Sequence, residues 1–189
     1  SLVAEDVDFE HERLKIAVSE MHGALDDMMK KTDLAASGEH REVLETYQMI
    51  SEDTGWFNRI DEAVSSGLTA EAAVQKINND IRARMNQVTD SYLRERILDL
   101  EDLSTRLLQH LSGSKALKGS LAGNETYYDV NNLVLIARNM GPAQLLDYER
   151  SKLVGLVLEE GSPTAHVSIV ARALDIPVVG QARNILNQI

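Results

Sequence analysis

The sequence predicts two structural units, an antiparallel helical bundle followed by an α/β unit with a parallel sheet. Residues 1–112 of the 189-residue chain hold 23 Asp and Glu against 12 Lys and Arg, whereas residues 113–189 hold seven of each. All three prolines and seven of the eleven glycines also fall in the second stretch. The apolar residues change there from helical spacing to short continuous runs. We therefore expect a helical domain over 1–112, a linker over 113–126 and an α/β domain over 127–189.

Helical spacing defines the first three predicted helices. After Leu14, apolar residues recur at steps of four and three positions: Val18, Met21, Leu25 and Met28. Carboxylates crowd the start of this stripe, where the helix dipole favours negative charge. A second helix is predicted from Glu39 to Ser51, and a short third helix ends at Ser66, with Gly55 interrupting the chain between them.

Two longer helices are predicted next. Thr69 is a suitable N-cap for the fourth helix, whose apolar stripe is predicted to continue to Val88 and Tyr92. Asp90 or Ser91 would cap a fifth helix, which carries a run of leucines: Leu100, Leu103, Leu107 and Leu111. Stripes of this kind form the core of a helical bundle, so we assign them no cofactor.

The second unit alternates strands and helices. Continuous apolar runs predict strands at 133–137, 153–158 and 176–180. A short helix opens at Pro142, and Thr164 is a suitable N-cap for the helix before the last strand. This alternation predicts a parallel sheet whose strands are buried on both faces.

Composition excludes several functions. A net charge of −11 argues against nucleic-acid binding, and no apolar run is long enough to cross a membrane. The absence of cysteine excludes disulfides, thiolate metal sites and a cysteine nucleophile, and it suits the cytoplasm. The histidines outside the last helix have no neighbouring ligands at metal-binding spacing, so we expect no metal site in this chain.

His166 is the main candidate for chemistry. It is predicted in the first turn of the last helix, directly after a glycine-containing loop at the carboxyl end of a strand. Helix N-termini favour phosphate, and neutral imidazole is a nucleophile near pH 7. Thr164 and Ser168 could donate hydrogen bonds to phosphoryl oxygens, and Arg172 could add charge or pair with a carboxylate. The spacing alone also fits a surface or capping histidine.

The segment around His166 has a familiar pattern. The residues from Glu160 to Gly180, EGSPTAHVSIVARALDIPVVG, resemble the phosphohistidine signature of enzymes that use phosphoenolpyruvate. That group includes enzyme I of the phosphotransferase system, pyruvate phosphate dikinase and phosphoenolpyruvate synthase. The resemblance implies a phosphoenolpyruvate-protein phosphotransferase, in which Nε2 of His166 accepts the phosphoryl group and passes it to the histidine of a small phosphocarrier protein.

The helical front resembles enzyme I in particular. The segments from Leu44 to Asp53 and from Tyr92 to Leu108 resemble helices of its bundle, which is inserted into a swivelling α/β domain and docks the phosphocarrier. The resemblance implies that the carrier contacts the second helix and its kink. The expected contacts there are Glu39, Val43, Tyr47, Ile50 and Asp53. Two further residues, His40 and Arg96, are expected to face the active site.

The loop before His166 resembles the nitrogen-related branch of enzyme I more than the sugar branch, because it reads Ser162-Pro-Thr-Ala-His166. Gly141-Pro142 stands where the family often has Thr-Pro or Ser-Pro, so one hydroxyl contact is missing. By this resemblance the α/β domain is incomplete here, and the phosphoenolpyruvate-binding barrel with its Mg²⁺ lies outside the chain, as does a sensory domain ahead of it. The chain itself would hold no cofactor, and the full-length protein is expected to be a homodimer.

Two alternatives remain open from the sequence. The first is the central domain of a dikinase or synthase, whose histidine shuttles between two sites of one polypeptide, although that function does not predict an acidic helical insert. The second is a non-enzymatic regulatory module that docks a carrier through its acidic bundle. Labelling of His166 by phosphate would separate the second from the others.

Overall fold

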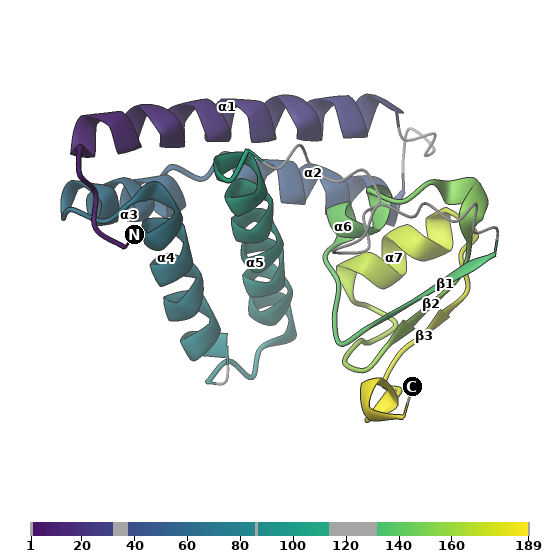
Figure 1. Ribbon diagram of the computed structural model, residues 1–189. Helices are drawn as coiled ribbons and strands as arrows, with labels where there is room; N and C mark the ends of the chain where they lie inside the picture. Colours follow the sequence, from purple (N-terminus) through teal and green to yellow (C-terminus); the bar gives the residue numbers. More distant parts are fainter. Residues whose placement is uncertain (1, 32–37, 86, 114–131, 189) are drawn as a thin grey trace. The chain divides into compact units, whose positions relative to one another are not determined.

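A computed structural model describes residues 2–31, 38–85, 87–113 and 132–188 (Figure 1). The described part divides into a helical unit, residues 1–30 with 47–116, and an α/β unit, residues 31–46 with 117–189. The helices of the first stretch are α1 (Val7–Lys31), α2 (Glu39–Ser51), α3 (Thr54–Ser65), α4 (Ala70–Met85) and α5 (Ser91–Leu111). The predicted linker at 113–126 falls almost wholly outside the described residues, so the predicted domain boundary stays a prediction.

Side-chain caps fix where three of these helices begin. Asp90 caps α5, its carboxylate accepting from the Leu93 N–H at 3.0 Å, and the Thr69 hydroxyl accepts from the Ala72 N–H at 3.3 Å in α4. Both predicted caps are confirmed. The break before α3 was expected at Gly55 but lies at Asp53, whose carboxylate accepts from the Trp56 N–H at 3.0 Å. The cap residue, rather than the glycine, therefore decides where the chain turns.

The fourth helix ends earlier than its apolar stripe predicts. Helix α4 stops at Met85, and Asp90 then starts a helix in a new direction. Tyr92 is therefore not part of the stripe, and its side chain is 62% exposed. The expected continuation through Val88 is wrong, because a cap interrupts the helical period that the stripe requires.

The core of the helical unit comes from facing stripes. Leu14, Met21 and Leu25 of α1 are buried, as their spacing predicts. Helix α4 packs against α3 and α5, and the last two contribute other fully buried side chains: Ile60, Val64, Leu103 and Leu107. Full burial of one such side chain contributes about 1.5–3 kcal/mol.

A buried ionic cluster ties three helices of this unit together. Arg13 of α1 donates to Glu10 at 2.9 Å, to Glu71 of α4, and to the Leu111 carbonyl at the end of α5 at 3.1 Å. Glu10 also accepts from the Ala70 N–H at 2.9 Å. Each charge has a partner, so the cluster fixes the register of the helices without leaving an isolated buried ion.

The α/β unit contains three parallel strands in the order β1–β2–β3, with bounds Leu133–Ala137, Leu153–Leu158 and Val178–Val179. Helices α6 (Pro142–Leu146) and α7 (His166–Ala173) connect them, together with the short 3₁₀ segments η1 (Arg150–Lys152) and η2 (Ile185–Asn187). The predicted helical bundle with a parallel sheet is confirmed. The third strand is shorter than the predicted run at 176–180.

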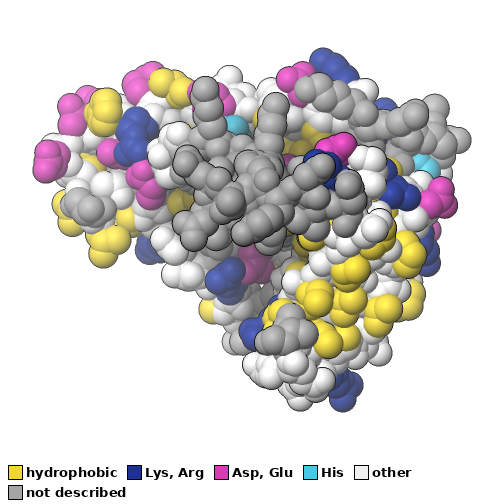
Figure 2. All heavy atoms as spheres, turned by 45° about the vertical axis from the view of Figure 1, so that its right-hand side comes forward, with side chains coloured by type: hydrophobic (Ala, Val, Ile, Leu, Met, Phe, Trp, Pro, Cys, Tyr) yellow, Lys and Arg dark blue, Asp and Glu magenta, His cyan; other side chains and the backbone are white. Residues whose placement is uncertain are grey.

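The sheet is apolar on both faces but covered on one. Helices α6 and α7 lie on one side of it (Figure 1), and the strand residues Leu135, Leu156 and Leu158 are buried. On the alternate positions Val134, Ile136, Val154 and Val179 are exposed, and hydrophobic side chains gather on this face in Figure 2. The expectation of burial on both faces is wrong for the described residues, because neighbouring side chains of a strand point to opposite sides.

Candidate functional site

Backbone packing positions the loop that carries His166. After β2, the amides of Glu159 and Glu160 donate to the carbonyls of Ala137 and Arg138, at 2.9 and 2.7 Å. These hydrogen bonds attach the start of the loop to the end of β1. The loop then reaches α7, whose first residue is His166.

Two glycines allow this loop to pack closely. A Cβ at Gly180 would lie 2.5 Å from the Gly161 carbonyl oxygen, and a Cβ at Gly161 would lie 2.9 Å from Cδ1 of Leu158. Both distances are far below contact distance, and the first involves backbone that cannot move aside alone. The segment after β3 therefore holds the loop before α7 only because neither position has a side chain.

The start of α7 lies one residue later than the sequence predicts. Ala165 is the N-cap residue, with extended φ and ψ of −60° and 142°, and no side chain caps the helix. The Thr164 hydroxyl lies 3.0 Å from the Ser162 hydroxyl instead. The predicted capping by Thr164 is therefore wrong, because the Ala165 N–H bonds to the Ser162 carbonyl and holds Thr164 in the preceding turn.

The helix separates the other predicted phosphate ligands. His166 is half-buried and Thr164 is exposed, in adjacent turns of the same segment. Ser168 lies about 200° around the helix from His166 and is buried. Arg172 is exposed in the last turn, about 9 Å along the axis, where a cation complements the helix dipole. Of the predicted group, only Thr164 therefore lies beside His166.

The predicted docking stripe of α2 faces inward. Val43, Tyr47 and Ile50 are all buried, so the expectation that their side chains form a docking surface is corrected. The Tyr47 hydroxyl donates to Asp102 at 2.7 Å, and burial, followed by the negative charge of Asp102, raises the pKa of Tyr47 well above its usual value. Apolar residues at helical spacing mark a core face, which is why the stripe is covered.

The remaining predicted residues of this region have local partners or stay exposed. Asp53 caps α3 and forms an ion pair with Arg96 at 3.4 Å. Glu39 is exposed in the first turn of α2, and His40 is half-buried beside it. The His40 ring lies over Gly38, where a Cβ would come within 2.9 Å of its Cε1. Asp53 and Arg96 are thus brought together, and the ion pair joins the start of α3 to α5.

The structure also exposes hydrophobic residues that sequence reasoning missed. Met49 is 72% exposed on α2, and Tyr92 and Leu93 are exposed in the first turn of α5. Met49 lies off the inward stripe of its helix, and such a position is the sequence signal that could have identified it. All three belong to the helical unit.

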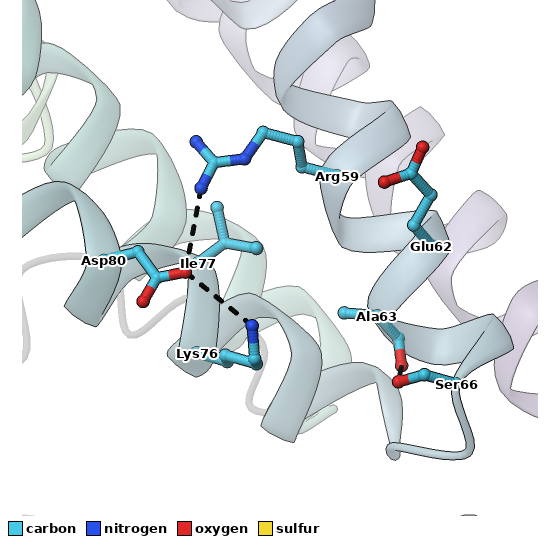
Figure 3. Close-up of a pocket in the computed structure, with 7 residues that line it drawn as sticks. All are labelled: Arg59, Glu62, Ala63, Ser66, Lys76, Ile77 and Asp80. Atoms are coloured by element: carbon cyan, nitrogen blue, oxygen red, sulfur yellow. Dashed lines mark hydrogen bonds and ion pairs between the residues drawn. The ribbon is translucent and has the colours of Figure 1, made fainter.

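A separate hollow of about 280 Å³ lies between α3 and α4 (Figure 3). Its polar lining includes Arg59 and Lys76, each 3.7 Å from the Asp80 carboxylate. No predicted site residue lines it.

The described part of the chain contains no cluster of three or more His, Asp or Glu placed to hold a metal ion. Within the same described residues, no helix combines the length and the apolar character that crossing a membrane requires.

Comparisons with known proteins match both parts of the chain. The family description "PEP-utilising enzyme, N-terminal" matches residues 1–96, and "PEP-utilising enzyme, mobile domain" matches residues 130–189. A phosphoenolpyruvate-protein phosphotransferase of Streptomyces coelicolor is 34% identical over 176 residues, which cover 93% of this chain. The chain spans only 30% of the length of that relative.

Two solved structures share the fold. An NMR structure of enzyme I covers all of this chain and 76% of its own, with a TM-score of 0.63 at 23% identity. A structure titled as the N-terminal domain of the nitrogen enzyme I covers 94% of this chain and 70% of its own, with a TM-score of 0.62 at 26% identity. The chain therefore belongs to the phosphoenolpyruvate-utilising enzymes and corresponds to the amino-terminal region of an enzyme I.

Proposed function

We propose that this chain is the phosphohistidine and carrier-docking region of a phosphoenolpyruvate-protein phosphotransferase, and that His166 carries the phosphoryl group. The observation that supports this most directly is the position of His166, the first residue of an uncapped helix that follows a loop fixed by backbone packing. The mobile-domain match includes this segment. The relatives with this activity are much longer than the chain, so the complete reaction belongs to the longer protein.

The chemistry assigned to this unit is one nucleophilic displacement. The Nε2 lone pair of His166 attacks phosphorus, the bond from phosphorus to the donor's leaving atom breaks, and the leaving group departs in line. The peptide dipoles at the start of α7 favour the negative charge of the phosphoryl oxygens, and the Thr164 hydroxyl is the nearest polar side chain of the predicted set. Ser168 is buried and Arg172 lies at the far end of the helix, so both have weaker support as ligands.

Metal chemistry is assigned to the part of the protein outside this chain. Phosphoryl transfer from phosphoenolpyruvate needs Mg²⁺ to neutralise charge on the donor. Because the described residues form no group that could hold the metal, the proposal contains no metal-dependent step here. Exchange between two phosphohistidines is close to thermoneutral and requires only opposed imidazoles with positioned donors.

The docking surface is proposed to differ from the one expected from sequence. Exposed Met49, Tyr92 and Leu93 provide apolar contact area, and the ion pair between Asp53 and Arg96 lies one turn beyond Tyr92 on α5. Since the excess acidic charge lies within residues 1–112, a carrier with a basic rim around an apolar centre suits this unit. His40 and Glu39 remain proposed contacts at the start of α2.

Several observations favour this function over the alternatives. The N-terminal match over residues 1–96 includes the first helices, a region that a dikinase or synthase function does not predict. The nitrogen branch is supported by one structural neighbour's title and by the Ser162–His166 wording. We propose a cytoplasmic enzyme that is dimeric at full length.

The test is to mix the chain with a carrier that carries ³²P on its histidine and to locate acid-labile phosphate by mass spectrometry. We expect the label on His166 and no label in His166→Ala, while His110→Gln behaves as the parent because His110 pairs with Glu20 on the helical unit. We also expect no label from phosphoenolpyruvate and Mg²⁺ alone. Label that survives in His166→Ala but is lost in His40→Ala would overturn the assignment.

A further inference from the structure

Three side chains of the helical unit form a second chemical cluster. His11 lies on α1, whereas Asp61 and Ser65 lie one turn apart on α3. The Asp61 carboxylate is 2.7 Å from Nδ1 of His11, and the Ser65 hydroxyl is 3.2 Å from Nε2 of the same ring. The two ring nitrogens are therefore engaged by different partners.

This order of contacts defines the tautomer of the ring. A carboxylate only accepts, so Nδ1 carries the proton and donates to Asp61. Nε2 is then the acceptor, and the Ser65 hydroxyl donates to it. Nucleophilic serines depend on this same sequence of carboxylate, imidazole and hydroxyl, because the imidazole removes the hydroxyl proton while the carboxylate orients the ring.

We propose that Ser65 is an activated nucleophile and a modification site for activated acyl esters. In the step, Ser65 Oγ forms a bond to the ester carbonyl carbon and the ester C–O bond breaks. The hydroxyl proton moves to Nε2 of His11 and then to the departing oxygen, which leaves as an alcohol. Atoms and charge balance without any other reactant.

Access and backbone hydrogen bonding define the extent of the reaction. Ser65 is exposed, so a reagent can reach it, whereas the His11 side chain is only 20% exposed. The amides that follow Ser65 are already used, since the Ser66 N–H donates to the Glu62 carbonyl and the Gly67 N–H to the Val64 carbonyl. These amides cannot stabilise the oxyanion of repeated hydrolysis. We therefore expect one stable acyl group per chain rather than turnover.

The experiment treats the protein with p-nitrophenyl acetate and follows the adduct by intact mass and tandem mass spectrometry. It is run in the His166→Ala background, because an accessible imidazole also reacts with activated esters. Ser65 should be acetylated about 100-fold faster than in His11→Ala, the lower range for a general base. Imidazole added to His11→Ala should restore part of the rate.

The neighbouring serine offers a matched control. Ser66 lies next to Ser65 but donates its hydroxyl hydrogen bond to the Ala63 carbonyl, so Ser66→Ala should leave the rate unchanged. Asp61 acts as a positioning residue, and Asp61→Glu, which keeps a carboxylate for Nδ1–H, should retain more of the rate than Asp61→Asn. Circular dichroism monitors folding of each variant. Acetylation of Ser65 and Ser66 at equal rates, or a His11→Ala rate equal to the parent's, would overturn the proposal.

Discussion

The helical unit and the α/β unit position their polar groups by different means. In the helical unit side chains hold one another, as in the hydrogen bond from Tyr47 to Asp102 and the cluster around Arg13. Around His166 the backbone does the positioning, through amides bonded to the end of β1 and the close approach of Gly180 to Gly161. The first unit should therefore be sensitive to polar substitutions, and the second to any added Cβ at its loop.

The largest effect is expected from Gly180→Ala. Its Cβ would meet the Gly161 carbonyl oxygen at 2.5 Å, so the loop before His166 must move. We expect a loss of roughly 2 kcal/mol or more in the stability of the α/β unit and a marked loss of phosphate transfer to His166. Urea unfolding and ³²P labelling measure the two effects.

Gly155→Ala is the matched control in the same sheet. Its Cβ would find neighbours no closer than 3.8 Å, which is ordinary contact distance. We expect a change within about 0.5 kcal/mol, because alanine is less flexible than glycine in the unfolded chain and fits here. Equal loss in both variants would show that backbone approach does not position the loop.

The next effect is expected from Tyr47→Phe. Loss of the hydroxyl deprives Asp102 of a donor in a buried site, which costs about 1–3 kcal/mol. The melting temperature of the helical unit should fall while transfer to His166 by the α/β unit stays near the parent rate. If the transfer rate falls as much as the stability, the two units are not independent in this respect.

The raised pKa of Tyr47 also predicts a pH dependence. The folded state binds the phenolic proton more tightly than the unfolded state does, so this contribution is fully present below the unfolded pKa of about 10. It is lost as the pH rises above that value, by up to about 1.4 kcal/mol per pH unit. Unfolding curves at alkaline pH should therefore be shallower in pH for Tyr47→Phe than for the parent.

A smaller difference is expected within the pair of Asp53 and Arg96. Asp53→Ala removes the cap of α3 and should cost about 1 kcal/mol. Arg96→Ala removes only an exposed ion pair at 3.4 Å and should cost less than about 0.5 kcal/mol. Thermal unfolding of the two variants measures both values, and a larger loss for Arg96→Ala would contradict this order.

The smallest effect on folding, but not on binding, is expected from Met49→Ala. Met49 is 72% exposed, so the melting temperature should barely change. If Met49 belongs to the docking surface, affinity for the carrier should fall about threefold to tenfold, mainly through a faster off-rate. Surface plasmon resonance at two salt concentrations separates this effect from electrostatic steering, which salt reduces. Unchanged affinity would remove Met49 from the docking surface.

Much of the fold was predictable from local pattern. The stripe from Leu14, the caps at Thr69 and Asp90, the alternation of strands and helices, and the signature around His166 all lie within short stretches of chain. Each depends on interactions between residues a few positions apart, so spacing and residue type suffice to predict it.

Other features depended on partners that no local pattern identifies. The stripe of α2 showed only that one face is apolar, and the tertiary structure decided that Tyr47 lies in the core against Asp102 rather than on a docking surface. Similarly, the apolar strands did not reveal that helices cover one face of the sheet while Val134 and Ile136 of the other are exposed. The start of α7 at His166 depended on the loop's bond to Ser162.

The sequence by itself determined the order of the elements and the residue most suited to accept a phosphoryl group. The tertiary structure decided which faces are covered and which side chains lie together, including the cluster of His11, Asp61 and Ser65, whose members come from two helices 50 or more positions apart. The physical reason is that periodicity and capping are local, whereas burial and hydrogen-bond partnership depend on segments that meet only when the chain folds.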